Sequence, residues 1–120
     1  MLINGKKTKN EDVTLTVYNN RITNVSYTAK YNELLGAVFV RIYGKINVAM
    51  SAGYGYTLFN IDSHLPNSNV ALSVKIGSDA SASITKKAAA YAVSSGGINI
   101  QPLDGDLNGY DIYITGFWFV

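Results

Sequence analysis

The sequence contains one histidine and no cysteine, so few side chains are available for nucleophilic catalysis. Asp62, Ser63 and His64 have the side-chain types of a hydrolytic triad, but they follow one another directly in the chain. Neighbouring residues cannot all converge on one reacting atom, and functional triads are assembled from distant segments. We therefore interpret these residues as part of a polar loop, and we predict no catalytic residue and no enzymatic activity.

Paired carboxylates for glycoside hydrolysis are a second kind of chemistry to consider, since it needs only two acids held at a set separation. The spacing of the aspartates selects no pair, and most of them lie in turn-like segments, where Asp commonly bonds its own backbone. A small β-fold hydrolase therefore ranks last among the functions that the sequence allows. The aspartates concerned are Asp62, Asp79, Asp104, Asp106 and Asp111.

One segment near the C-terminus resembles the opening of a calcium-binding loop. Asp104, Asp106 and Asn108 occupy its first, third and fifth positions, and a glycine, Gly109, follows at the sixth. The twelfth position, where such loops place a bidentate glutamate, is Thr115, inside a strand-like segment. A six-residue match is common by chance. We therefore predict a plain turn, with no metal and no cofactor.

Nine tyrosines are present, and two of them, Tyr54 and Tyr56, lie on a glycine-rich segment. This segment lacks the Lys-Ser/Thr ending of a phosphate-binding loop. Amphipathic tyrosine rings suit both interface contacts and stacking on sugars. Tyrosines also commonly flank strands in a sandwich, so a purely structural role stays open. Together with His64 on the next long loop, Tyr54 and Tyr56 are the candidate ligand-binding residues.

The composition indicates a single globular domain with few charges on its surface. Of the 120 residues, 48% are hydrophobic and 15% are charged, against about a quarter charged in an average domain. A partner copy that covers part of the outside would account for this balance. The net charge of +2 does not indicate nucleic-acid binding. We expect no membrane insertion either, because no apolar run approaches the ~18 residues of a membrane helix and the N-terminus lacks a signal-peptide pattern.

The hydrophobic pattern has a period of two in most of the chain, which is typical of half-buried strands. We predict a bend at Gly44 in the longest of these segments, and strand in preference to helix for the alanine-rich residues 86–93. Short strands separated by turn signals predict one all-β domain, an antiparallel β-sandwich or jelly roll over residues 13–120, preceded by a linker or lead-in over residues 1–12. The expected strands cover residues 13–18, 25–31, 35–50, 57–61, 70–76, 86–93, 98–103 and 110–120.

The C-terminal segment stops alternating after Gly116, because the four residues that follow are all apolar. A strand that is apolar on both sides needs cover on both sides. Burial of four such side chains would contribute about 8 kcal/mol, comparable to the whole net stability of a domain. We therefore expect this end to be essential for folding and partly covered by sister copies. The expected interface residues are Phe117, Trp118 and Phe119.

The order of several segments resembles the C-terminal, receptor-binding head domain of tail-fibre and baseplate proteins of tailed bacteriophages. The resemblance rests on the order of the expected strands and not on a single diagnostic motif. It covers the chain from about Val13 onward. The segments that carry it are residues 42–46 with Gly44, the loop-closing Leu65-Pro66, residues 70–76, residues 94–100 and the aromatic residues 110–120.

This resemblance implies a compact β-sandwich head that forms a homotrimer and acts in the phage virion after synthesis in the bacterial cytoplasm. It would recognise a host cell-wall saccharide or assemble with other tail and baseplate proteins, without catalysis. Such heads usually end a much longer chain, whereas this sequence starts at Met1. The alternative is a monomeric carbohydrate-binding module of a cellular protein, which the mass in solution would distinguish from a trimer.

Overall fold

The computed structural model describes residues 2–3, 6–7, 10–77 and 86–120 of the chain, and these residues form strands, turns and loops. The part described has no helix long and apolar enough to span a membrane. Residues 78–83, whose small and polar side chains predict a turn, lie outside the described residues, as does Asp79. The strands are β1 (Leu2–Ile3), β2 (Lys6–Lys7), β3 (Asn10–Asp12), β4 (Leu15–Val17), β5 (Ile22–Asn32), β6 (Ala37–Ile46), β7 (Tyr56–Ile61), β8 (Val70–Gly77), β9 (Ala88–Ala92), β10 (Gly97–Pro102) and β11 (Asp111–Phe119).

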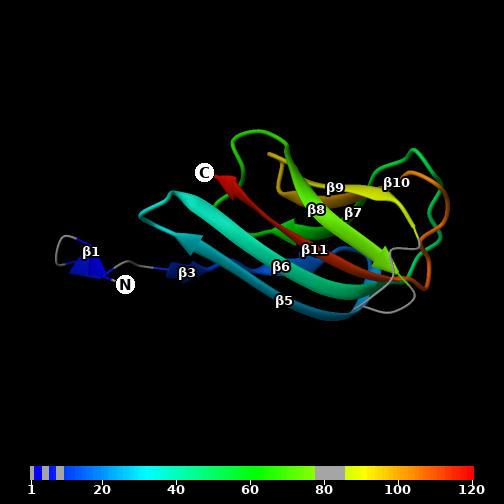
Figure 1. Ribbon diagram of the computed structural model, residues 1–120, viewed down its shortest axis with the longest axis horizontal. Helices are drawn as coiled ribbons and strands as arrows, with labels where there is room; N and C mark the ends of the chain where they lie inside the picture. The colour runs from blue at the N-terminus through cyan, green and yellow to red at the C-terminus, as the bar shows by residue number, and fades with distance from the viewer. Residues whose placement is uncertain (1, 4–5, 8–9, 78–85) are drawn as a thin grey trace.

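Nine of these strands form one antiparallel sheet in the order β3-β5-β6-β11-β8-β9-β10-β7-β4, while β1 and β2 pair with each other. The sheet curls at β8, which pairs with β11 on one side and with β9 on the other. The two halves thereby face each other as layers (Figure 1). Contacts between the layers include the rings of Tyr27 and Phe59, whose centroids lie 6.5 Å apart. The predicted all-β, antiparallel, sandwich-like fold is therefore confirmed.

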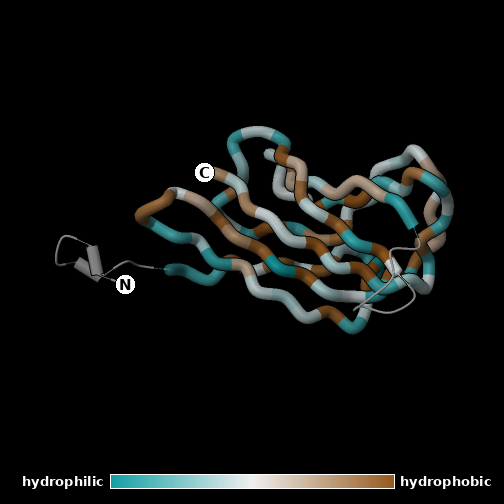
Figure 2. The backbone as a smooth tube through the Cα atoms, viewed as in Figure 1, coloured by the Kyte–Doolittle hydropathy of each residue, from teal (hydrophilic) through white to brown (hydrophobic). Residues whose placement is uncertain are grey.

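The core lies between the two layers and is filled from alternate positions of the strands. On β6, Val38, Val40, Ile42 and Ile46 point inward and are buried. The alternation of hydrophobic and hydrophilic residues along the strands is visible in Figure 2. No polar or charged residue is buried among the described residues, so the hydrophobic effect dominates the cohesion of the layers.

The longest predicted strand differs from the observed one at both ends. Instead of residues 35–50, β6 covers Ala37–Ile46, because Gly36 adopts φ 64° in the turn before it. The irregularity expected at Gly44 lies in the neighbouring strand, where the register of β5 shifts between Thr23 and Ser26. Gly44 has another role: a Cβ there would lie 2.5 Å from Cδ1 of Ile22, so the glycine makes room for that side chain.

The sheet also begins earlier than Val13. Within the region expected to be a lead-in, β3 pairs with the end of β5, from Asn10 opposite Asn32 to Asp12 opposite Lys30. The last of these pairs forms an ion pair between Asp12 and Lys30. The alanine-rich residues 86–93 contain β9, so strand was the right choice over helix.

Candidate functional site

Strand β11 lies between β6 and β8, and its side chains alternate between the two sides of the sheet up to its last residue. Ile112, Ile114 and Trp118 point inward and are at most 1% exposed. Phe117 and Phe119 point outward and are 47% and 60% exposed. The period of two therefore continues through the aromatic residues, although all of them are apolar.

The three expected interface residues thus lie in different surroundings. Trp118 packs in the core of its own chain, and its Nε1 donates a hydrogen bond to the carbonyl oxygen of His64 at 2.7 Å. Its ring is not available to a partner copy unless the core opens. Phe117 and Phe119 remain available. The sequence predicts that both sides of this C-terminal segment are covered. Within the chain, only the side that carries Trp118 is covered.

The outward side of β6 and β11 carries paired aromatic rings, because the register places like residues opposite each other. Tyr113 lies opposite Tyr43, and Phe117 lies opposite Phe39. The tyrosine rings stack with centroids 4.3 Å apart and planes at 11°, and the phenylalanine rings stack at 5.6 Å and 29°. We refer to these four residues, Phe39, Tyr43, Tyr113 and Phe117, as the aromatic face.

Between the two stacked pairs lies a polar row. Arg41 of β6 is opposite Thr115 of β11 on one side and opposite Thr28 of β5 on the other. An open depression of about 460 Å³ covers this row, and Tyr113 and Phe117 line it. A second depression of about 330 Å³ begins on the far side of Phe117. The site is therefore a shallow surface with a polar centre and aromatic flanks, carried on a rigid sheet.

The electrostatics of this surface centre on basic and phenolic groups. The hydrogen bond with Tyr113 raises the pKa of the Tyr43 phenol above its ordinary value, aided by burial, while the nearby Arg41 acts in the opposite direction. Lys45 and Asp111 form an ion pair at 3.4 Å at one end. The Arg41 guanidinium has no ion pair or hydrogen bond within the part of the chain that the structure describes.

The ligand-binding candidates from the sequence do not form one site. Tyr54 is 68% exposed on its loop, whereas the Tyr56 hydroxyl accepts a hydrogen bond from the Ser51 amide at 2.7 Å. These tyrosines lie at the start of β7, and His64 follows its far end (Figure 1). The two loops are therefore at opposite ends of the sandwich, and a single small ligand cannot bridge them.

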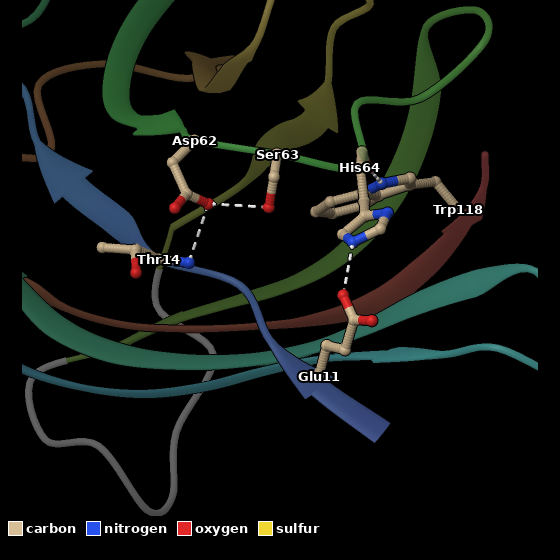
Figure 3. A network of polar contacts seen from close by, with 6 residues as sticks. All are labelled: Glu11, Thr14, Asp62, Ser63, His64 and Trp118. Atoms are coloured by element: carbon tan, nitrogen blue, oxygen red, sulfur yellow. Dashed lines mark hydrogen bonds and ion pairs between the residues drawn. The ribbon is translucent and has the colours of Figure 1, made fainter. Parts of the chain in front are cut away.

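Asp62, Ser63 and His64 form separate contacts, as Figure 3 shows. Oδ1 of Asp62 accepts hydrogen bonds from the Thr14 amide and from Oγ of Ser63, both at 3.0 Å. The His64 ring instead lies 3.1 Å from Oε2 of Glu11 and stacks on the ring of Tyr31 at 3.8 Å. No relay from aspartate through histidine to serine exists here. Through the contact between His64 and Glu11, this loop holds β3 against the end of the sandwich.

The calcium-like segment is held by its own backbone contacts. Oδ1 of Asp106 accepts hydrogen bonds from the amides of Asn108 and Met50, both at 2.9 Å. These two amides lower the pKa of the Asp106 carboxyl. Oδ1 of Asp104 accepts one from the Lys87 amide at 3.1 Å. Among the described residues no group of three or more acidic or histidine side chains could hold a metal ion.

Comparison of the chain with protein-family models, with curated proteins and with solved structures finds no match. The aromatic face was missed by the reasoning from sequence, although a signal for it exists. Phe39 and Tyr43 share one parity in their segment, and Tyr113 and Phe117 share one parity in theirs. What the sequence does not show is that these two segments pair in this register.

Proposed function

We propose that this protein is a non-enzymatic component of a phage virion: the head domain of a tail fibre or baseplate protein, which binds a saccharide of the host cell wall. The observation that carries this proposal is the aromatic face with its polar centre. Binding sites combine apolar and aromatic surface with a few polar groups that fix orientation. An open face suits a polysaccharide chain, which must enter from the side.

The chemistry of the aromatic face matches that of a sugar. A pyranose has apolar C–H surfaces that can lie against aromatic rings, and a rim of hydroxyl groups that need hydrogen-bond partners. Tyr43 and Tyr113 supply rings with polar tips. Thr28, Arg41 and Thr115 supply donors and acceptors between the ring pairs. The envelope of a bacterial host is rich in polysaccharide, so a surface of this chemistry supports the proposed recognition role.

A homotrimer is the second part of the proposal, and a cluster at one end of the sandwich supports it. Leu34, Leu35, Phe119 and Val120, here named the apolar end, are between 44% and 60% exposed. The Val120 amide donates to the Gly36 carbonyl at 2.9 Å, which joins the chain end to the β5–β6 turn. Figure 2 shows this turn as hydrophobic. Contiguous exposed apolar residues are typical of contacts between subunits.

One observation favours the alternative, a monomeric carbohydrate-binding module of a cellular protein. The core of the single chain is closed, with Trp118 and its neighbours buried by their own chain. Association is therefore not required to complete the interior. Sedimentation of the purified protein separates the two proposals, because the virion head is expected to be a trimer and the appended module a monomer.

The apolar end is tested by the double substitution Leu34→Ser and Leu35→Ser. In a trimer held by this end, the substitutions should yield a folded monomer. Leu103→Ser is the matched control, since Leu103 is 55% exposed elsewhere on the molecule, and it should leave the trimer intact. A double variant that remains trimeric would show that the copies meet through another surface.

The recognition role is tested by binding to a panel of bacterial cell-wall polysaccharides. Tyr113→Ala and Phe117→Ala are expected to lose most of the binding, whereas Tyr54→Ala on the distant loop should retain it. The opposite result, with loss on Tyr54→Ala alone, would move the site to the loop that the sequence suggested. Absence of binding to every polysaccharide would favour a role in tail or baseplate assembly instead.

A further inference from the structure

We propose that the saccharide recognised by the aromatic face is acidic, and that the Arg41 guanidinium pairs with a carboxylate on its sugar ring. This inference rests on the proposed recognition function and narrows it to one chemical class, a polysaccharide that contains uronate residues.

Arg41 lies at the centre of the depression, on the middle strand of three. It is exposed, and the residues opposite it on β5 and β11 are Thr28 and Thr115, which are neutral. A planar guanidinium presents its donors in a fork that fits a carboxylate with two parallel hydrogen bonds. The threonine hydroxyls on either side can bond the remaining oxygens of the ligand.

The charge around Arg41 is unbalanced in favour of a ligand anion. On the outward side of β3, β5, β6, β11 and β8, both acidic residues are already paired with lysines, whereas Arg41 and Lys75 form no ion pair within the described residues. A positive surface attracts an anionic polymer and raises its rate of association. The two ion pairs on this side are Lys30–Asp12 and Lys45–Asp111.

The same imbalance argues against a second copy of the chain as the occupant of this face. Symmetric packing of the aromatic face on itself would bring Arg41 of each copy close to its equivalent, with no acid at the centre to offset the repulsion. The four residues of the apolar end carry no charged side chain. The apolar end, as the contact between copies, is therefore separate from the positive face, which suits an anionic ligand.

The spacing of the aromatic pairs fits a ring that carries the carboxylate. Residues two positions apart on a strand are separated by roughly 7 Å, so one ring pair lies about this far from Arg41 on each side. A uronate places its carboxylate directly on the pyranose, which allows the sugar to lie against Tyr43 and Tyr113 while the carboxylate reaches Arg41. A phosphodiester polymer of open-chain polyols has the charge but no ring to stack.

The test compares tetragalacturonate with its methyl ester, which keeps the rings and removes the charge, by calorimetry on the full chain. The unsubstituted protein should bind the acid at least about tenfold more tightly than the ester, as expected for charge-assisted hydrogen bonds. Arg41→Gln should abolish this preference while it retains weak binding of the ester. Arg41→Lys should keep part of the preference, since it preserves the charge but not the fork. Arg21→Gln, the same change at a guanidinium that bonds the Thr57 carbonyl of β7 away from the face, should change nothing.

Several outcomes would overturn the inference without touching the proposed function. Equal binding of acid and ester, or a preference that survives Arg41→Gln, would leave saccharide recognition intact and remove the acidic specificity. Equally tight, Arg41-dependent binding of a glycerol-phosphate polymer would show that phosphate, not carboxylate, is recognised. By contrast, dissociation of a trimer on Tyr43→Ala, whose ring contacts Tyr113 and not the apolar end, would show that the face is an interface between copies, and it would overturn the site as well as the inference.

Discussion

The two sides of β11 have nearly the same apolar character but different surroundings. Inward, Ile114 and Trp118 are at most 1% exposed, and the ring nitrogen of Trp118 reaches the loop after β7. Outward, Phe117 and Phe119 stack only on neighbours in their own sheet. The opposite layer covers the first side, and no described part of the chain covers the second. Hydrophobicity alone therefore does not decide which residues are buried in the core and which stay exposed.

Adjacent residues of β11 are therefore expected to have different roles. Substitutions on the inward side should cost stability and leave binding unaffected in whatever protein still folds. Substitutions on the outward side should leave the fold intact and change binding or association. A reversed pattern, with stability lost on the outward side and binding lost on the inward side, would refute this division.

The largest effect is expected for Trp118→Ala. The ring is fully buried, and its Nε1 satisfies the His64 carbonyl, so truncation removes packing and leaves that acceptor without its partner. Large-to-small changes of this kind cost about 3–5 kcal/mol, a large part of a domain's net stability. Urea unfolding followed by circular dichroism measures the loss. A variant that unfolds at nearly the same urea concentration as the parent would show that Trp118 is not in the core.

A smaller loss is expected for Gly116→Ala, which also lies on the inward side. A Cβ at this position would lie 2.6 Å from Cδ2 of Leu72, so the buried Leu72 side chain has to move. Overpacking of this type costs about 1–3 kcal/mol. The control is Thr115→Ala, one residue away on the outward side, for which we expect a change within about 0.5 kcal/mol. Equal unfolding midpoints for the two variants would contradict the assignment of the two sides.

The sequence was sufficient for the fold because alternation was clear on most strands. Residues 70–76 alternate cleanly, and β8 covers Val70–Gly77. The errors arose where local pattern and tertiary pairing differ. Residues 35–50 keep one parity, but the strand is limited by the turn at Gly36 and by the partner strand β11. A hydrophobic pattern indicates on which side of the sheet a residue lies. It does not indicate the length of the strand with which its own strand pairs.

The candidate site was less predictable, for two physical reasons. An all-apolar stretch at residues 117–120 has no contrast between its sides, so the sequence does not show that only Trp118 would be covered by its own chain. The stacked pair of Tyr43 and Tyr113 depends on register between strands that are distant in sequence. Nothing near Glu11 indicates its contact with His64 either, because loops after a strand follow no periodic rule.

On the outward side, Phe117→Ala should cost only about 1 kcal/mol of stability. The ring is about half exposed, and what is lost is its stacking with Phe39 and its edge contact with Phe119, at 5.6 Å each. Urea unfolding measures this cost, and the binding assay on the same protein should show the larger change. Loss of stability as great as that of Trp118→Ala would mean that the outward rings, too, are needed to hold the layers together.

The smallest expected effect concerns the stability of the protein at alkaline pH, and its cause is the titration of Tyr43. Its pKa is raised chiefly by the hydrogen bond with Tyr113, so the folded state favours the neutral phenol more than the unfolded state does. This contribution is complete below the ordinary tyrosine pKa of 10.0 and is lost as the pH rises through the higher folded value. Tyr43→Phe removes the titrating group, so the stability of this variant should fall less steeply than that of the unsubstituted protein between about pH 9 and pH 11.

Because the pair of tyrosines lies on the outward side, the core should be unaffected by this substitution, and both proteins should keep the same near-ultraviolet spectrum of Trp118 at neutral pH. A parallel fall in stability for the two proteins would show that the Tyr43–Tyr113 hydrogen bond does not persist in solution, and it would weaken the case for a preformed aromatic face.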